Sequence, residues 1–430
     1  MAHQLNHQNN PQHAQQLNQP KQLLNQPLTL PNGTVINNRL AKAATSETLA
    51  TYSNNPTPKH VQLYKRWAAS GIGMIITGNI MIDRRALGEA ANVAIEDERD
   101  FSMLQQWAQG VTGQGSQLWA QLNHPGKQAI KGLNVRTISA SAVPFNAEMQ
   151  AMFATPDAAT DAEIKDIIQR FGRSAAICKK AGFSGVQIHA AHGYLINQFL
   201  SPPHNLRDDH WGGSAEKRRN FLIEVYKAVR TEVGQDFPVA IKLNSADFQK
   251  GGFTEEESLA TIQALATLGI DLIEISGGTY ETGVAKSQQK ASSAAREAFF
   301  LEFAEKVRQS VTTPLMVTGG FRSVEGMNNA LASGALDLVG IARLMAIDPD
   351  APQFLLNGQN SRYAVKPIKT GIKKIDSLGV MEVLWYALQL KRIAQGKPTK
   401  PNESGLWALL KSLLSNGWGT YATKRSRAPV

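Results

Sequence analysis

Three side chains that can bind and protonate a carbonyl compound follow one short apolar run. His189 and His192 are separated by two alanines, and Tyr194 comes two residues later. Two imidazoles can donate hydrogen bonds to one carbonyl oxygen, and a phenol can supply a proton nearby. A zinc site is the alternative use of paired histidines, but no third ligand stands at metal spacing. We therefore expect catalytic residues here and no metal site.

Two glycine-containing segments have the chemistry of a phosphate site. The segment 318–323 reads TGGFRS, and a helix is expected to begin near Ser323. Glycines let backbone N–H groups approach an anion closely, and a helix N-terminus adds a partial positive charge. The segment 340–343 reads GIAR and ends with an arginine that can clamp the same phosphate. The two segments together predict phosphate binding.

Lys242 offers a different chemistry. It lies near the end of an expected strand, where a lysine amine can form a Schiff base with a carbonyl substrate. A barrel lyase or aldolase without cofactor is therefore an alternative function, although it leaves the phosphate segments and Gln121 without a role. A non-catalytic basic binding protein is a third class, because the formal net charge is +10.

These residues fall at the ends of regularly spaced strands. Eight short apolar or β-branched runs alternate with amphipathic helical stretches, which is typical of a (β/α)8 TIM barrel with its functional residues at the C-terminal strand ends. A doubly wound sheet would place a glycine-rich turn after the first strand, and none is present there. The expected strands are Leu40–Thr45, Gly73–Ile80, Gln117–Asn123, Gly185–Ala190, Val239–Asn244, Leu272–Ser276, Leu315–Thr318 and Leu338–Ala342. The expected helices are Lys59–Ser70, Glu98–Gln109, Asp161–Ala181, Ala215–Val233, Thr254–Leu268, Ala295–Ser310 and Ser323–Ala332.

We expect three regions along the chain. Residues 1–27 are rich in Gln and Asn, with too little apolar surface to offset the entropy of ordering, and are interpreted as a disordered extension. Residues 28–352 form the α/β barrel, and residues 353–430 form a basic helical extension. An apolar stripe in this extension is expected to dock on the barrel or on a neighbouring subunit rather than on a membrane. The stripe comprises Leu406, Trp407, Leu409, Leu410, Leu413 and Leu414.

Composition excludes several other classes. The single cysteine, Cys178, excludes a disulfide framework, a cysteine-bound iron–sulfur cluster and a multi-cysteine zinc site. No apolar run reaches the ~18 residues of a membrane-spanning helix, and no signal-peptide pattern is visible, so we expect a cytoplasmic protein. The region 361–430 holds 13 Lys or Arg and 3 Asp or Glu, which accounts for the whole net charge. Because this charge lies outside the segments with the chemistry, a nucleic-acid partner is not expected.

The longest motif resembles the signature of the Old Yellow Enzyme family of FMN-dependent ene-reductases. It reads HAAHGYLINQFLSPPHNLRDDHWGGSAEKR at 189–218. The resemblance extends over most of residues 28–350. Further similar segments are NRLAKAAT at 38–45, WAQLNHPGK at 119–127, IKLNSADF at 241–248, ISGGTYE at 275–281 and DLVGIAR at 337–343.

This resemblance implies a bound FMN, NADH or NADPH as reductant, and an enone or enal as substrate. It implies that His189 and His192 bind the substrate carbonyl oxygen and that Tyr194 protonates the α-carbon. Thr45 is similar to the family's residue near flavin O4, and Gln121 to its glutamine at the flavin pyrimidine edge. The other cofactor contacts that the resemblance implies are Ala43, Gly78, Lys242, Gly319, Gly320, Ala342 and Arg343.

The chain departs from the family pattern at several of these positions. Lys242 stands where many relatives have arginine, which keeps the positive charge but not the planar fork. The usual proline before the first threonine is replaced by KAA at 42–44, with Lys42 expected to point outward or to bond a loop. Ala342 stands where glycine usually precedes Arg343. The particular enone and a possible homo-oligomer stay open.

Overall fold

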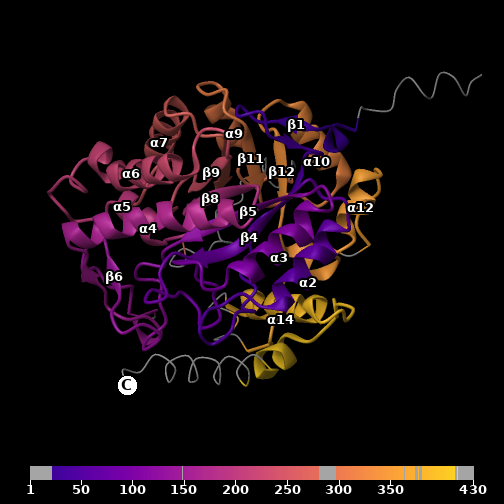
Figure 1. The fold of residues 1–430 in the computed structure, drawn as a ribbon, viewed down its shortest axis with the longest axis horizontal. Coiled ribbons are helices and arrows are strands. Elements are labelled where there is room, and N and C mark those ends of the chain that lie inside the picture. Colours follow the sequence, from indigo (N-terminus) through magenta and orange to yellow (C-terminus); the bar gives the residue numbers. More distant parts are fainter. Residues whose placement is uncertain are drawn as a thin grey trace, which may run out of the picture.

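The structure, a computed structural model, describes residues 22–147, 149–279, 297–362, 364–372, 376, 380–411 and 414. Its centre is a closed barrel of eight parallel strands, which confirms the expected fold class (Figure 1). The strands pair in the order β10-β11-β12-β3-β4-β5-β8-β9, so strands that follow one another in this barrel are neighbours. They are β3 (Leu40–Lys42), β4 (Met74–Met81), β5 (Gln117–Asn123), β8 (Gly185–Ala190), β9 (Val239–Asn244), β10 (Leu272–Ser276), β11 (Leu315–Thr318) and β12 (Leu338–Ile341).

The sequence predicts the strand bounds well except at the first strand. β3 ends at Lys42 rather than at Thr45. The N–H of Ala43 still donates to the carbonyl of Ile341 at 2.8 Å, and beyond this bond the chain leaves the barrel wall. Thr45 therefore lies above the strand end, where a βα loop can present it to a ligand.

A ring of helices surrounds the barrel (Figure 1). Two long helices begin with capping boxes, because Thr160 and Thr254 each exchange hydrogen bonds with a glutamate three residues later. The helix expected from residue 295 begins at Leu301, and residues 295–296 lie outside the described part of the chain. The helices are α2 (Pro58–Ala68), α3 (Phe101–Thr112), α4 (Asp161–Lys180), α5 (Leu195–Leu200), α6 (Ala215–Val233), α7 (Glu255–Thr267), α9 (Leu301–Arg308), α10 (Val324–Ala332), α11 (Arg343–Ile347), α12 (Ala351–Leu356) and α14 (Val380–Ala394).

An apolar layer closes the N-terminal end of the barrel. A small hairpin of β1 (Leu28–Thr29) and β2 (Val35–Ile36) precedes the first barrel strand. Leu30 and Ile36 are buried in one cluster with Met74, the first residue of β4. Because apolar side chains fill this end, a polar functional site is expected at the opposite end, where the strands have their C-termini.

Ordered structure begins before the boundary expected at residue 28. The 3-10 helix η2 (Leu23–Asn25) buries Leu24, whose N–H donates to Asn328 Oδ1 of α10 at 3.1 Å. Burial of apolar surface thus fixes residues 22–27 to the barrel, although the segment around them is polar. The remainder of the expected extension, residues 1–21, lies outside the described residues.

The C-terminal region packs on the barrel through α14, which lies against α2 and α11. Trp385 of α14 is buried, and its Nε1 donates to the carbonyl of Glu403 at 3.0 Å. Within the described residues, no helix is long and apolar enough to cross a membrane.

Most of the apolar stripe does not pack on the barrel of its own chain, because Leu406, Trp407, Leu410 and Leu414 are 42%, 62%, 45% and 79% exposed. Docking of these residues on a neighbouring subunit stays a prediction. The segment instead packs through small residues, because Ala408 is buried and Gly405 approaches the backbone of Lys369 too closely for a side chain. Leu413 lies outside the described residues.

Candidate active site

The structure brings His189, His192 and Tyr194 together at the C-terminal end of β8. The ring centroid of His189 lies 5.3 Å from that of His192 and 4.8 Å from that of Tyr194. His192 and Gly193 have φ angles of +61° and +78°, which turn the chain back over the barrel mouth. This turn places the two later side chains beside the first. The roles assigned to the three residues stay predictions.

Burial keeps both imidazoles neutral. It holds the pKa of His189 and of His192 well below the usual value, and the charge of Lys242 lowers both further. The N–H of Ala191 points at His189 Nδ1 at 3.3 Å, so Nε2 carries the proton of that ring. His192 Nε2 lies 2.8 Å from the hydroxyl oxygen of Ser276. Two neutral rings can each donate one hydrogen bond to a carbonyl oxygen.

Asn79 is a site residue whose role the sequence does not indicate. Its Nδ2 donates to the Tyr194 hydroxyl oxygen at 3.3 Å, and its Oδ1 accepts from Asn92 Nδ2 at 3.4 Å. The β4–β5 register shifts between Ile76 and Asn79, a type of irregularity that re-aims side chains near active sites. An N–H donated to the phenol oxygen stabilises the negative charge left when the proton departs.

A chain of hydrogen bonds crosses the barrel interior below these residues. Gln121 Nε2 donates to Gln187 Oε1 at 2.8 Å, and Gln187 Nε2 donates to Glu274 Oε2 at 2.8 Å. Lys242 Nζ completes the chain with a 2.7 Å bond to Glu274 Oε1. Gln187 was missed by the sequence prediction, although it stands two residues before His189 and so faces the same side of β8. The chain fixes the orientation of the Gln121 amide.

The environment of Lys242 disfavours the Schiff-base alternative. Lys242 and its partner Glu274 have side chains only 5% and 0% exposed. A Schiff-base lysine must present its amine to the substrate, whereas Lys242 Nζ already donates to the buried carboxylate of Glu274. The geometry therefore favours Lys242 as part of the buried hydrogen-bonded chain.

Thr45 lies above the end of β3 with an unused hydroxyl. Its Oγ1 is buried and has no hydrogen-bond partner among the described residues. Buried polar atoms in native structures almost always have partners, so this hydroxyl fits a ligand contact such as flavin O4. Ala43 differs, because it is buried in the inner apolar cluster and its N–H is used by the barrel ladder.

Lys42 points away from the barrel axis, but it does not reach solvent. It is fully buried, and its Nζ donates to the carbonyls of Ala43 at 3.0 Å and Ile76 at 3.2 Å. The ammonium also lies 4.6 Å from the ring centroid of Trp67 on α2. Burial lowers the pKa of Lys42 to about 8. This lysine therefore joins the strand to the surrounding helix.

Position 78 needs a glycine because the chain is tightly packed there, and not because its backbone N–H is available to a ligand. Its N–H donates to Glu47 Oε1 at 2.8 Å and to the Tyr64 hydroxyl at 3.0 Å. A side chain at this position would collide with the Glu47 carboxylate. A cofactor contact at Gly78 would therefore have to use other atoms of the residue.

The segment after β11, the expected phosphate cradle, has a backbone geometry that suits close approach to an anion, and its phosphate-binding role stays a prediction. Gly319 and Gly320 have φ angles of +120° and +99°, which residues with side chains rarely adopt. Ser323 caps α10 by accepting from the N–H of Gly326. The hydroxyl of Thr318 is buried with no hydrogen-bond partner among the described residues. These backbone and hydroxyl groups lie within the segment for which the sequence predicts phosphate binding.

Glu297 holds this cradle in the structure. Its Oε2 accepts from the backbone N–H of Arg322 at 3.1 Å, from the N–H of Ser323 at 2.9 Å and from the Ser323 hydroxyl at 2.9 Å. Negative groups are favoured at a helix N-terminus. These N–H and hydroxyl groups therefore already donate hydrogen bonds to an anionic group. A phosphate group would have to replace the Glu297 carboxylate.

Arg343, the expected phosphate clamp, forms an ion pair with the C-terminal helix. Its Nη1 lies 3.0 Å from Glu382 Oε2 of α14, with side chains 42% and 31% exposed. An ion pair this accessible contributes little free energy, so exchange for a phosphate costs little. Ala342 is the N-cap of α11, next to this pair.

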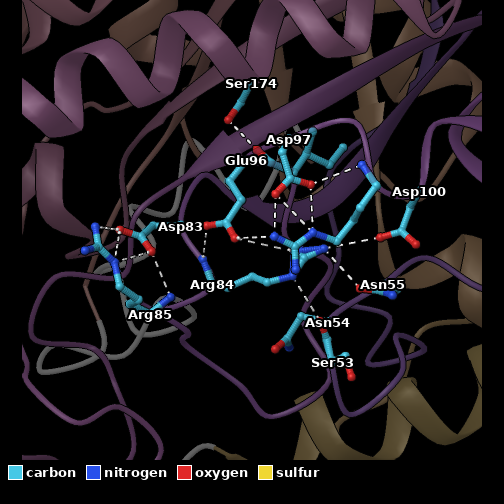
Figure 2. A network of polar contacts seen from close by, with 12 residues as sticks. Ser53, Asn54, Asn55, Asp83, Arg84, Arg85, Glu96, Asp97, Asp100 and Ser174 are labelled. Carbon is cyan, nitrogen blue, oxygen red and sulfur yellow. Dashed lines mark hydrogen bonds and ion pairs between the residues drawn. The ribbon is translucent and has the colours of Figure 1, made fainter. Parts of the chain in front are cut away.

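A cavity of about 790 Å³ lies beside the loops that follow β4 and β5 and the start of α4. Figure 2 shows the network of arginines and carboxylates along this region. Arg84 pairs with Asp100 at 3.2 Å, and Arg85 pairs with Asp83 at 2.7 Å. None of the predicted site residues lines the cavity. Because its arginines are already paired with carboxylates, the wall does not define an anion site.

The comparisons with known proteins agree with this architecture. Residues 23–361 match the NADH:flavin oxidoreductase / NADH oxidase family, and the chain belongs to that family. The resemblance drawn from the sequence motifs is thereby confirmed. The protein is an oxidoreductase, and its family uses a flavin together with NADH or NADPH.

Individual relatives cover most of the chain. It is 37% identical over 355 residues to the NADH-dependent flavin oxidoreductase iliE of Hypocrea jecorina (strain QM6a), which covers 77% of this chain and 88% of the relative. It is 36% identical over 354 residues to the protein of the same name from Neonectria sp. (strain DH2), covering 76% of this chain but only 46% of that longer relative. The fold is similar to that of the Old Yellow Enzyme homologue from Zymomonas mobilis, with a TM-score of 0.69, 23% identity, and coverage of 80% of this chain and 94% of that chain.

Proposed function

We propose that the protein binds FMN and reduces the C=C bond of an α,β-unsaturated carbonyl compound with hydride taken from NADH or NADPH. The observation that carries the proposal is the convergence of His189, His192 and Tyr194 at one strand end. Conjugate reduction requires donors for a carbonyl oxygen and an acid for the adjacent carbon. When bound, FMN supplies the hydride, and the side chains supply binding, orientation and the proton.

The two histidines bind the carbonyl oxygen of the substrate. Because both rings are neutral, each donates a single hydrogen bond and neither gives up its proton. His189 donates from Nε2, since Ala191 occupies its Nδ1. A Ser276 hydroxyl donated to His192 Nε2 leaves Nδ1 of that ring for the substrate. These bonds draw electron density to the oxygen and make the β-carbon electrophilic.

Tyr194 protonates the α-carbon. Its hydroxyl oxygen keeps the N–H bond from Asn79 after the proton has left, which stabilises the phenolate. The ring is only half-buried, so water can return the proton.

Several chain groups would hold FMN. Gln121 and Thr45 would bind the ring, and Gly319, Gly320 and Arg343 the phosphate. The unpartnered Thr45 hydroxyl and the anion-accepting amides before α10 support this fit. The sequence contains no G-x-G-x-x-G turn after a strand to seat a second phosphate, which favours FMN over FAD.

The test is oxidation of NADH or NADPH by the purified holoprotein with and without an enone such as cyclohexenone, under anaerobic conditions. We expect oxidation that depends on the enone and yields the saturated ketone. Reduction of the bound flavin without any transfer to enones or enals would overturn the proposal.

A further inference from the structure

We propose that the substrate carries, besides its unsaturated carbonyl, a second polar group that is uncharged and both donates and accepts hydrogen bonds. A hydroxyl or a lactam has this chemistry. Asn123 and Gln128 would bind it. This inference rests on the proposed function, because it specifies the class of carbonyl compound that the same site accepts.

Asn123 is a buried amide without a partner. It is fully buried, and neither Nδ2 nor Oδ1 has a hydrogen-bond partner among the described residues. In the β5–β8 ladder, Leu122 is paired with Ile188, so the next position places Asn123 beside His189. Side chains alternate along a strand, and the Gln121 side chain faces the barrel interior. Asn123 therefore faces the same side, next to the carbonyl-binding histidine.

Gln128 is a second amide of this kind. It is 4% exposed, and both its Nε2 and its Oε1 are without hydrogen-bond partners in the described part of the chain. A Cβ built on Gly193 would lie 2.6 Å from Gln128 Oε1. Gly193 separates His192 from Tyr194 in the sequence. The Gln128 amide thus borders the turn that carries both catalytic side chains.

Neighbouring buried amides are satisfied, which makes these two exceptional. Gln198 donates to the carbonyls of Pro125 and Gly193 at 3.2 and 2.6 Å, and its Oε1 accepts from the Ser139 hydroxyl at 2.8 Å. Buried polar groups without partners are rare in native proteins and carry a desolvation penalty. Two such groups beside the carbonyl site point to a ligand that completes them.

The two amides also define the charge of that ligand group. Each amide presents an acceptor oxygen and donor N–H groups and carries no charge. A carboxylate would leave the amide oxygens facing an anion, and an ammonium would leave the N–H groups unpaired. A neutral group with both functions satisfies both amides. A plain hydrocarbon enone would leave them unpaired and is therefore expected to bind more weakly than an enone that carries the polar group.

The experiment compares binding of cyclohexenone with binding of its γ- and δ-hydroxylated derivatives, by calorimetry on the oxidised holoprotein. We expect at least one hydroxylated probe to bind about tenfold or more tightly than cyclohexenone. Asn123→Leu and Gln128→Met should abolish the preference and retain cyclohexenone binding. Gln106→Met, an exposed change on α3, should leave the preference intact.

Thermal unfolding of the variants gives a readout independent of turnover. Removing an unpaired amide in favour of a similarly shaped apolar side chain should leave the melting temperature unchanged or raise it. Asn205→Leu is the matched control, because Asn205 Nδ2 donates to the carbonyls of Phe199 and Trp211 at 2.7 and 2.8 Å. That variant should melt at a lower temperature. A comparable loss in Asn123→Leu would contradict the inference.

Equal affinities for all probes, or a preference that survives in both variants, would also overturn it. Probes that bind with the expected preference but are never reduced would overturn the proposed function alone. Probes that are reduced with equal affinities would overturn only the inference.

Discussion

The two halves of the site use their polar groups differently. Around the ends of β5 and β8, His189 and Tyr194 are oriented by neighbouring chain groups and keep their chemistry for a ligand. Around the ends of β11 and β12, the donors already bind carboxylates, Glu297 at the start of α10 and Glu382 on α14. We refer to these as the substrate half and the phosphate half.

The difference indicates where each half should respond to change. The substrate half is preorganised, so loss of a single group should impair binding or chemistry directly. The phosphate half must exchange internal carboxylates for a ligand anion, so removing a carboxylate there should strengthen nucleotide binding. Substitutions that weaken binding or catalysis in the substrate half, together with substitutions that strengthen nucleotide binding in the phosphate half, would support this contrast.

The largest effect is expected for Tyr194→Phe. Loss of one general acid typically costs about 10²–10⁴-fold in rate, and the acid is needed only when the enone is protonated. Stopped-flow absorbance of the flavin should show slow reoxidation by cyclohexenone and unchanged reduction by the nicotinamide cofactor. Equal impairment of both half-reactions would mean that Tyr194 has a structural role.

A smaller effect is expected for the carbonyl-binding pair. His189→Ala or His192→Ala removes a hydrogen bond to a ligand oxygen in a buried site, which costs about 1–3 kcal/mol. The affinity for a phenol that perturbs the flavin spectrum should therefore fall about 5–150-fold. An affinity equal to that of the wild type would count against the carbonyl-binding role.

Acid should destabilise the substrate half through its neutral histidines. Burial lowers the pKa of His124, which follows β5, to about 4. Because the unfolded imidazole titrates near its ordinary value, the unfolded chain binds more protons below about pH 6.5, and stability falls from there toward pH 4. We expect a loss of about 2 kcal/mol from this residue by about pH 5. His124→Asn keeps an acceptor for the Gly126 N–H. In this variant the free energy of unfolding, measured with urea, should depend less on pH between about pH 6.5 and 4. An unchanged pH dependence would contradict the assignment of this effect to His124.

The smallest effects are expected in the phosphate half, with the opposite sign. Glu297→Gln removes the charge that competes for the amides before α10 and should tighten FMN binding by about tenfold. Glu382→Gln frees Arg343 from an accessible ion pair and should tighten FMN binding about twofold to fivefold. Fluorescence titration of the flavin-free protein measures both. Weaker FMN binding in Glu297→Gln would show that this carboxylate supports the cradle.

The substrate half is largely predictable from sequence because its information is local. His189, His192 and Tyr194 lie within six positions, so the position of His189 at the end of a clear apolar strand also places the other two side chains nearby. The barrel follows from the same periodicity, since eight strands with short connections leave few other topologies.

The partners of these residues could not be predicted because they depend on distant contacts. Glu382 reaches Arg343 from a helix that the resemblance does not cover, and Glu297 reaches Ser323 across a βα connection. Asn79 meets Tyr194 through an irregular strand register that no sequence pattern announces. The sequence does not indicate that Trp407 is exposed on this chain, because an amphipathic stripe does not specify whether its apolar face packs on the barrel or on a neighbouring subunit.

Identification of the flavin released by heat from the purified protein is the most direct test of the proposed function. Mass spectrometry should detect FMN in an equimolar amount with the chain, as the single phosphate cradle predicts. FAD in its place, or no flavin from a folded protein that also fails to take up FMN, would contradict the assignment of these residues to an FMN-dependent reductase.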